Sequence, residues 1–302
     1  MSSTPVQVLV AGAQKAGTTS VLAYLDHHPS LVGHAAPEMP YFIDGEMFQA
    51  GWEPTARRYY GRAEPADGQL RLAKSAGVCF LPEAAMRAHR HNPDMKVLVM
   101  LREPTQRAFS AYRYFVAREM ETAPTFAEAL AREEARLAES ADRNHLFAYV
   151  GRGLYADQLR RLYELFGREQ VHVAVFEEFL AAPVAGLHAV CDWLGVARLS
   201  DDDVSAMVTT RHNATETVGT PLLGLDRLRP LARRIPLPPV SRVALRRMVT
   251  RARPVQHLRL EPAVSQQLRE RFEAPNDALF DLLGRRIAAW EPNPAAAAGN
   301  DR

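Results

Sequence analysis

Apolar residues along this chain form two kinds of pattern, short continuous runs and stretches with helical spacing. The runs at residues 6–11, 95–101 and 171–175 are rich in Val and Leu, which is typical of strands buried on both faces. Helical spacing follows the first run as far as residue 28 and recurs at residues 105–118, 154–166, 183–194, 262–273 and 277–290. Strands that alternate with helices predict an α/β fold with a parallel sheet covered on both faces.

The pattern breaks between Pro221 and Pro254, where the sequence becomes rich in Pro and Arg. Eleven arginines and two acidic residues lie between Arg211 and Arg259, so the segment is strongly basic. We interpret residues 221–254 as a mobile lid over an anionic or amphipathic acceptor, with a solvated arginine-rich face as the alternative. Residues 292–302 are expected to form a disordered tail, which leaves a single domain at residues 1–291.

Composition narrows the class of protein. A chain of 302 residues with 47% hydrophobic and 24% charged residues is ordinary for a globular domain and excludes disordered or fibrous classes. Two cysteines are too few for a disulfide framework, and no apolar run approaches the ~18 residues of a membrane span. No signal peptide is predicted, so we expect a cytoplasmic enzyme. Scarce lysine beside abundant Ala and Arg is typical of a GC-rich bacterial gene, which favours a role in secondary metabolism.

A candidate phosphate-binding loop follows the first predicted strand. Gly12 to Ser20 reads G-x-x-x-x-G-T-T-S between a strand and a helix, where backbone N–H groups and the helix dipole favour an anion. A Walker A loop has Lys after its second Gly, but here Thr18 has that position and Lys15 lies three residues earlier. This departure argues against ATP or GTP as the ligand and against Mg²⁺-dependent phosphoryl transfer.

The segment Gln14-Lys15-Ala16-Gly17-Thr18-Thr19-Ser20 resembles the 5′-phosphosulfate loop of sulfotransferases that use 3′-phosphoadenosine 5′-phosphosulfate (PAPS), and most closely the heparan sulfate N- and 3-O-sulfotransferases and their bacterial relatives. A second segment, from Leu101 to Tyr112, resembles the family's 3′-phosphate segment R-x-P-x-x-R-A-x-S-x-Y. Arg102 at a strand end and Ser110 two helical turns later could face one phosphate. The resemblance implies a three-layer, P-loop-like fold with a central, mostly parallel five-stranded sheet.

Two further segments resemble parts of the family that take part in catalysis. The resemblance of residues 37–42 to E-x-x-(F/Y)-F implies that Glu38 is the general base, with His34 as the alternative. Residues 72–80 resemble E-K-(S/T)-x-x-x-F, which implies that Lys74 lies beside the transferred group, although Ala73 replaces the family's acidic residue. The implied catalytic residues are therefore Glu38, Lys15 and Lys74, without a metal.

The resemblance weakens in the C-terminal third, where relatives close a basic loop on the 3′-phosphate. Arg211 is the candidate for that role, or arginines beyond residue 226. The expected reaction is transfer of a sulfuryl group from PAPS to a hydroxyl or amine of a small-molecule or glycan acceptor. Neither nucleic acid nor a membrane is expected as a partner, and the oligomeric state stays open. The rival interpretations are a P-loop nucleotide kinase and a nucleotide-binding module that has lost catalysis.

Overall fold

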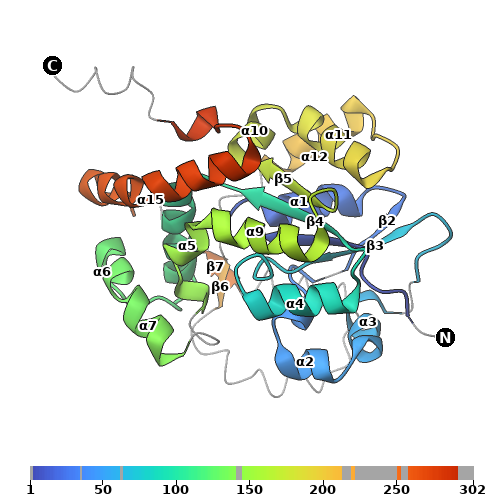
Figure 1. Ribbon diagram of the computed structural model, residues 1–302, viewed down its shortest axis with the longest axis horizontal. Helices are drawn as coiled ribbons and strands as arrows, with labels where there is room; N and C mark the ends of the chain where they lie inside the picture. Colours follow the sequence, from blue (N-terminus) through green and yellow to red (C-terminus); the bar gives the residue numbers. More distant parts are fainter. Residues whose placement is uncertain are drawn as a thin grey trace.

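Five parallel strands form the central sheet of the protein, in the order β2-β3-β1-β4-β5 (Figure 1). The computed structural model describes residues 3–34, 36–61, 64–140, 145–212, 219–221, 250–252 and 258–291. The strands of this sheet are β1 (Val8–Gly12), β2 (Leu31–Val32), β3 (Leu70–Lys74), β4 (Lys96–Leu101) and β5 (Val171–Val175). The expected α/β fold with a five-stranded sheet is therefore confirmed, and this sheet is wholly parallel.

Helices account for most of the remaining described chain. The α-helices are α1 (Thr18–Asp26), α2 (Gly45–Gln49), α3 (Trp52–Tyr60), α4 (Pro82–His91), α5 (Pro104–Ala117), α6 (Phe126–Ala131), α7 (Glu133–Glu139), α9 (Tyr155–Phe166), α10 (Phe176–Ala181), α11 (Pro183–Leu194), α12 (Asp201–His212) and α15 (Pro262–Leu283). Short 3₁₀ helices lie at Pro40–Phe42, His145–Phe147, Gly151–Gly153 and Ala288–Trp290.

The direction of each crossover decides which face of the sheet a helix covers. Connections between parallel strands are right-handed, so connections that move in opposite directions along the sheet lie on opposite faces. The connection through α1 moves from β1 outward to β2, whereas those through α4 and α9 move toward β4 and β5. Accordingly α4 and α9 pack together on one face, and α1 lies on the other with α11 and α12 (Figure 1).

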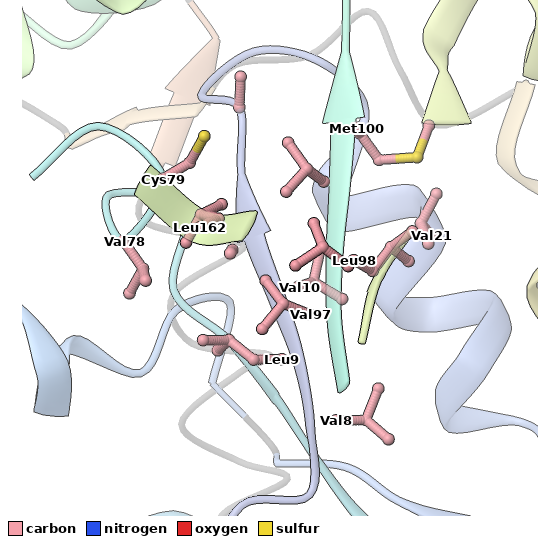
Figure 2. Packing of buried hydrophobic residues seen from close by; sticks show 14 of the residues in the cluster. Val8, Leu9, Val10, Val21, Val78, Cys79, Val97, Leu98, Met100 and Leu162 are labelled. Atoms are coloured by element: carbon pink, nitrogen blue, oxygen red, sulfur yellow. The ribbon is translucent and has the colours of Figure 1, made fainter. Parts of the chain in front are cut away.

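Burial on both faces explains the apolar composition of the central strands. Val8, Leu9 and Val10 of β1 are all fully buried, although successive side chains point to opposite faces. Figure 2 shows these residues beside β4, with Leu162 of α9 and Val21 of α1 packed against the strands. The core of the protein thus fixes the position of β1, from which the phosphate loop emerges.

The strand order also predicts where a ligand binds. β1 and β4 are neighbours, and the chain leaves their carboxyl ends in opposite directions. Ligands of open α/β sheets bind at such a switch point. Three candidate segments begin at this edge of the sheet: the loop after β1, Lys74 at the end of β3, and Arg102 directly after β4.

A second apolar cluster supports the segment beyond β4. Side chains of α5, α6 and α15 form it together with Tyr149, and include Tyr112, Phe126 and Phe272. The buried Glu121 carboxylate accepts hydrogen bonds from Arg136 and from the Tyr149 hydroxyl at 2.6 Å, and these bonds lower its pKa to about 2 against the opposing effect of burial. This network fixes the far end of α5.

The C-terminal part of the chain differs from the sequence expectation. One helix, α15, continues through Pro275 in place of the two helices expected at residues 262–273 and 277–290. It ends at Leu283, and a short 3₁₀ helix at Ala288–Trp290 follows. A proline removes one backbone hydrogen bond, but the apolar face continues on both sides of it, with Val264, Leu268 and Phe272 before it and Leu279 after it, all buried. Packing of this face therefore outweighs the local preference of proline.

Only the ends of the expected lid are described. β6 (Gly219–Pro221) and β7 (Thr250–Ala252) form a two-stranded antiparallel sheet that brings the two ends of the segment together. The expected lid between them and the expected tail at residues 292–302 lie outside the described residues.

Candidate active site

The candidate phosphate loop connects β1 to α1. Its residues 13–17 are tied to β4 by the Ala13 N–H, which donates to the Met100 carbonyl at 2.6 Å. Gly17 has a φ of 79°, and a Cβ atom at this residue would lie 2.7 Å from the Phe176 ring, so two independent constraints require glycine. Helix α1 begins at the carboxyl edge of the sheet with the N–H groups of Thr18 and Thr19, and the Ser20 N–H already donates to the Gly17 carbonyl at 2.9 Å.

Lys15 lies in the middle of this loop with a φ of 68°. Its ammonium nitrogen is 4.1 Å from the centroid of the Tyr114 ring. Burial and, to a smaller extent, the like charges of Arg102, Arg118, Lys74 and Arg113 together lower the pKa of Lys15 to about 8. Within the described residues, the ammonium has no carboxylate partner.

Arg102 approaches the loop from the end of β4. Its Nη1 donates to the Lys15 carbonyl at 3.1 Å, and its guanidinium carbon is 4.8 Å from the centroid of the Phe176 ring. Its Nε is buried without a hydrogen-bond partner in the described chain. Burial lowers the pKa of Arg102, and the negative charge of Glu177 partly offsets this effect. The guanidinium is thus held beside the loop with donor capacity left for an anion.

Helix α5 begins directly after Arg102. The Glu103 carboxylate caps it by accepting from the N–H groups of Thr105 at 2.9 Å and Gln106 at 2.7 Å, and Pro104 occupies its first position. Ser110 is half-buried on this helix, two turns from its start. The cap therefore sets the direction in which Ser110 and the residues after it project.

Lys74, at the end of β3, joins the loop to the segment before Met39. Its side chain is 3% exposed, and its ammonium donates to the Thr19 hydroxyl at 3.1 Å, the Pro37 carbonyl at 2.8 Å and Glu38 Oε1 at 2.8 Å. The pairing with an acid that Ala73 cannot provide thus comes from Glu38, a residue 36 positions earlier. One ammonium connects the α1 N-terminus with a carboxylate.

The Glu38 carboxylate is held at both oxygens. Oε1 accepts from Lys74, and Oε2 accepts from the Ala76 N–H at 3.2 Å. The side chain is nevertheless 47% exposed, so a substrate can reach it. The carboxylate therefore has a fixed orientation and is also accessible to a substrate.

His34 has a different environment. Its Nε2 accepts a hydrogen bond from the Lys74 backbone N–H at 3.0 Å, and its ring lies edge-on to Tyr59 and Tyr60 with both centroids 5.9 Å away. The residue is buried, and this burial lowers its pKa to about 4. The imidazole is therefore neutral at physiological pH, and its Nε2 lone pair is already used.

The remaining predicted residues occupy the loop or the helix after it. Ala16 and Thr18 are buried, Gln14 and Ser20 are half-buried, and Thr19 is exposed in the first turn of α1. The structure thus brings Lys15, Lys74, Glu38, Arg102 and the loop to one edge of the sheet. Arg211 lies in the last turn of α12, and its side chain is outside those that the structure describes.

The sequence interpretation missed four residues around the loop. Tyr114, Arg113 and Arg118 lie on or next to α5, and Phe176 begins α10. Arg118 contacts the Tyr114 ring with its guanidinium carbon 4.4 Å from the ring centroid, and Phe176 packs between Gly17 and Arg102. The spacing of Ser110, Tyr114 and Arg118, four residues apart, was the available signal because it places them on one helix face.

Positive charge dominates the site. Lys15, Arg102, Arg113 and Arg118 form no ion pair with any described residue, and Lys74 is paired with Glu38 alone. Such an arrangement favours a ligand with several negative charges.

In the described ranges, no group of three or more His, Cys, Asp or Glu side chains could hold a metal ion. None of the described helices is both long and apolar enough to cross a membrane.

The fold and the site define an α/β protein in which cations from three strand ends, Lys15, Lys74 and Arg102, meet at the β1–α1 loop. Residues 5–215 match the family model of the sulfotransferase domain, and the chain belongs to this family. The family resemblance in the sequence is therefore confirmed.

Individual relatives are similar over different lengths. Human heparan sulfate glucosamine 3-O-sulfotransferase 6 is 28% identical over 198 residues, which are 65% of this chain and 54% of that protein. Its mouse counterpart is 27% identical over 94% of this chain and 73% of that protein. The crystal structure of a sulfotransferase from Alicyclobacillus acidocaldarius matches with a TM-score of 0.67 and 27% identity, over 95% of this chain and 99% of that one. This chain thus spans only about half of the human relative.

Proposed function

We propose that this protein transfers a sulfuryl group from PAPS to a hydroxyl or amine of a small-molecule or glycan acceptor. The observation that carries the proposal is the Lys74 ammonium, which hydrogen-bonds Thr19 at the phosphate loop and Glu38 at 2.8 Å. A carboxylate that can accept a proton is thereby placed next to the site where a phosphate-linked group would lie. Membership of the sulfotransferase family supports the same conclusion.

The unpaired cations fit the charges of this donor. Lys15 and the N–H groups of the loop would neutralise the 5′-phosphate as it leaves. Arg102, whose Nε lacks a partner within the described chain, would bind the 3′-phosphate together with Ser110. Arg211 remains the proposed residue for closure on that phosphate.

The reaction would be an in-line displacement at sulfur. Glu38 takes the proton of the acceptor hydroxyl or amine, the acceptor atom forms a bond to sulfur, and the bond between sulfur and the bridging phosphate oxygen breaks. The products are the sulfated acceptor and 3′,5′-adenosine bisphosphate. Lys74 stabilises the sulfuryl oxygens during transfer. A sulfuryl group carries one negative charge fewer than a phosphoryl group. The two ammonium groups of Lys15 and Lys74 can therefore stabilise the charge that develops during transfer without a metal.

Glu38 rather than His34 is the proposed base. The Glu38 carboxylate is oriented and about half exposed, whereas the His34 ring is buried and accepts a hydrogen bond from the Lys74 N–H. Using His34 as a base would require breaking that bond. We assign His34 the role of holding the end of β3.

The competing functions make different demands of the loop. A nucleotide kinase would need a cation at the Thr18 position, which is instead a buried threonine. A module without catalysis would have no need for a carboxylate joined to Lys74.

The curated relatives are named for heparan sulfate glucosamine, and we propose a glycan or a small metabolite as the acceptor here. We also propose that the protein acts in the bacterial cytoplasm and that the basic residues 221–254 form a lid over the acceptor.

Ligand binding tests the donor first. Thermal unfolding is measured with 3′,5′-adenosine bisphosphate and, separately, with ATP and Mg²⁺. A ligand at 100 times its Kd stabilises the fold by about 2.7 kcal/mol, so the bisphosphate is expected to raise the Tm clearly and ATP is not. A shift with ATP and Mg²⁺ alone would contradict PAPS as the donor and favour a nucleotide kinase or a nucleotide-binding module.

Turnover tests the assigned roles. With labelled PAPS and a panel of acceptors, Lys15→Ala is expected to lose most activity and Glu38→Gln to lower kcat while keeping affinity for the bisphosphate. Arg102→Ala is expected to lose the preference for PAPS over adenosine 5′-phosphosulfate. Glu38 would be excluded as the base if Glu38→Gln kept the wild-type kcat and His34→Asn did not.

A further inference from the structure

The Tyr114 ring lies between the phosphate loop and the end of α5. It is half-buried, its centroid is 4.1 Å from the Lys15 ammonium, and the Arg118 guanidinium carbon is 4.4 Å from the same centroid. Tyr114 follows Ser110 by four residues, so the helix face that presents Ser110 to the proposed 3′-phosphate site also presents this ring. None of the motif segments assigned above includes Tyr114.

Electrostatic forces from the protein should drive the Lys15 ammonium away from this place. Arg102, Arg113, Arg118 and Lys74 surround it with like charge, and burial removes water. Neither a hydrogen bond nor an ion pair to a described residue holds the ammonium. The face of an aromatic ring attracts a cation through its quadrupole, and the attraction grows as water is removed. The ring is thus the attractive contact that this structure provides.

We propose that Tyr114 is a positioning residue, whose ring holds the Lys15 ammonium at the phosphate loop without neutralising its charge. A carboxylate at the same distance would hold Lys15 more strongly, but it would compete with the donor phosphate and cancel the positive potential. A ring leaves the three N–H groups and the full charge available. This inference rests on the proposed function, because it assigns Lys15 to the 5′-phosphate of the donor.

The ring face, and not the phenol hydroxyl, makes this contact. Burial raises the pKa of Tyr114, an effect that Arg118 opposes and Glu38 adds to, so the phenol is neutral at physiological pH. Phenylalanine should therefore replace Tyr114 in this role, whereas leucine, of similar bulk but without a π face, should not. Arg118 has the opposite effect on Lys15, because its like charge repels the ammonium.

The first experiment measures Lys15 without any donor. Trace acylation with isotope-labelled acetic anhydride is followed against pH by peptide mass spectrometry, and the chain's three lysines are separable. We expect Lys15 to titrate near pH 8 in the wild type. Tyr114→Leu should lower the midpoint by about 0.5 to 1 pH unit because the ammonium loses an attractive contact, and Tyr114→Phe should not. Arg118→Gln should raise it. A midpoint in Tyr114→Leu equal to or above the wild-type value would overturn the proposal.

The second experiment measures the Kd of 3′,5′-adenosine bisphosphate by calorimetry. Tyr114→Leu is expected to weaken binding roughly 3- to 30-fold, and Tyr114→Phe by less than about twofold. Tyr163→Leu is the matched control. The Tyr163 ring lies near the C-terminal end of α9, away from the phosphate loop, and its centroid is 4.7 Å from the Arg168 guanidinium carbon. This variant should bind the bisphosphate as the wild type does. Equal weakening by the Leu and Phe variants, or none by either, would refute the role of the ring.

The two experiments separate the inference from the function on which it rests. If the wild type fails to bind the bisphosphate, the proposed function fails, while the acylation midpoints still report whether Tyr114 holds Lys15. If the bisphosphate binds and the midpoint in Tyr114→Leu does not fall, the function stands and the positioning role is wrong.

Discussion

Lys74→Met provides a demanding test of the connection between the phosphate loop and the candidate base. Methionine keeps much of the apolar stem of lysine, so packing changes little while the ammonium is removed. Three acceptors lose a donor: the Thr19 hydroxyl, the Pro37 carbonyl and the Glu38 carboxylate, at 3.1, 2.8 and 2.8 Å. The substitution should therefore affect both the free energy of unfolding and catalysis.

The exposure of the two partners determines the magnitude. Removing one partner of a fully buried ion pair costs about 3–5 kcal/mol, whereas an exposed pair contributes about 0.2–1 kcal/mol. The Lys74 side chain is 3% exposed, whereas that of Glu38 is 47% exposed and the residues Thr19 and Pro37 are exposed too, so water can partly replace the lost donor and the cost falls between these limits. We expect Lys74→Met to lower the free energy of unfolding by about 2–3 kcal/mol.

A double-mutant cycle with Glu38→Gln isolates the pair. Urea unfolding of the wild type, both single variants and the double variant should give a coupling energy of about 1–2 kcal/mol between Lys74 and Glu38. Binding of 3′,5′-adenosine bisphosphate is measured on the same four proteins. A cost below about 0.5 kcal/mol for Lys74→Met, or a coupling energy of zero, would contradict the connection through this ammonium.

Three further substitutions or conditions test separate parts of the site. Gly17→Ala should cost about 1–3 kcal/mol in urea unfolding, because alanine is strained at a φ of 79° and its Cβ would lie 2.7 Å from Phe176; a neutral effect would contradict the described loop. His34, with a pKa of about 4 in the fold against 6.5 unfolded, binds its proton preferentially in the unfolded chain, so up to about 3 kcal/mol of stability should be lost as the pH falls from 6.5 to 4. NMR should find its ring neutral at pH 5, and a charged ring there would refute its burial. Lys96→Gln should lower stability by about 1–2 kcal/mol but leave bisphosphate binding unchanged, because its ammonium donates to the carbonyls of Trp193 and Leu194 at the end of α11 and lies over the Trp193 ring.

Periodicity predicted the strands formed by longer apolar runs and missed β2, which has two residues, and β3. β1, β4 and β5 were all predicted as continuous apolar runs. β3 was not predicted from its pattern, because it contains Arg71 and Lys74, which are both buried. Arg71 forms an ion pair with Glu64, and Lys74 with Glu38, so each charge has a partner outside the strand that the periodicity of the strand cannot reveal.

The candidate site was predictable where one segment contains both the residue and the reason for it. The loop motif placed Lys15 and Gly17 correctly between a strand and a helix. The contact between Lys74 and Glu38 was not predictable, because it depends on the sheet bringing together residues 36 positions apart. Ala73 replaces the acidic residue that the family has beside this lysine, and the sequence did not indicate that Glu38 would provide a partner instead.

The cations around the loop show why residue types alone could not complete the site. Arginines on an amphipathic helix are ordinarily solvated surface residues. The four-residue spacing from Ser110 and Tyr114 could have singled out Arg118, but the sequence offered no reason to separate Arg113 from the other arginines. The structure separates them by their like-charge effect on Lys15 and by the absence of an ion-pair partner in the described chain. Repulsion among these groups is a cost that the free protein bears at the loop. A polyanionic donor would relieve this repulsion on binding, so the same charges that destabilise the empty site favour the ligand.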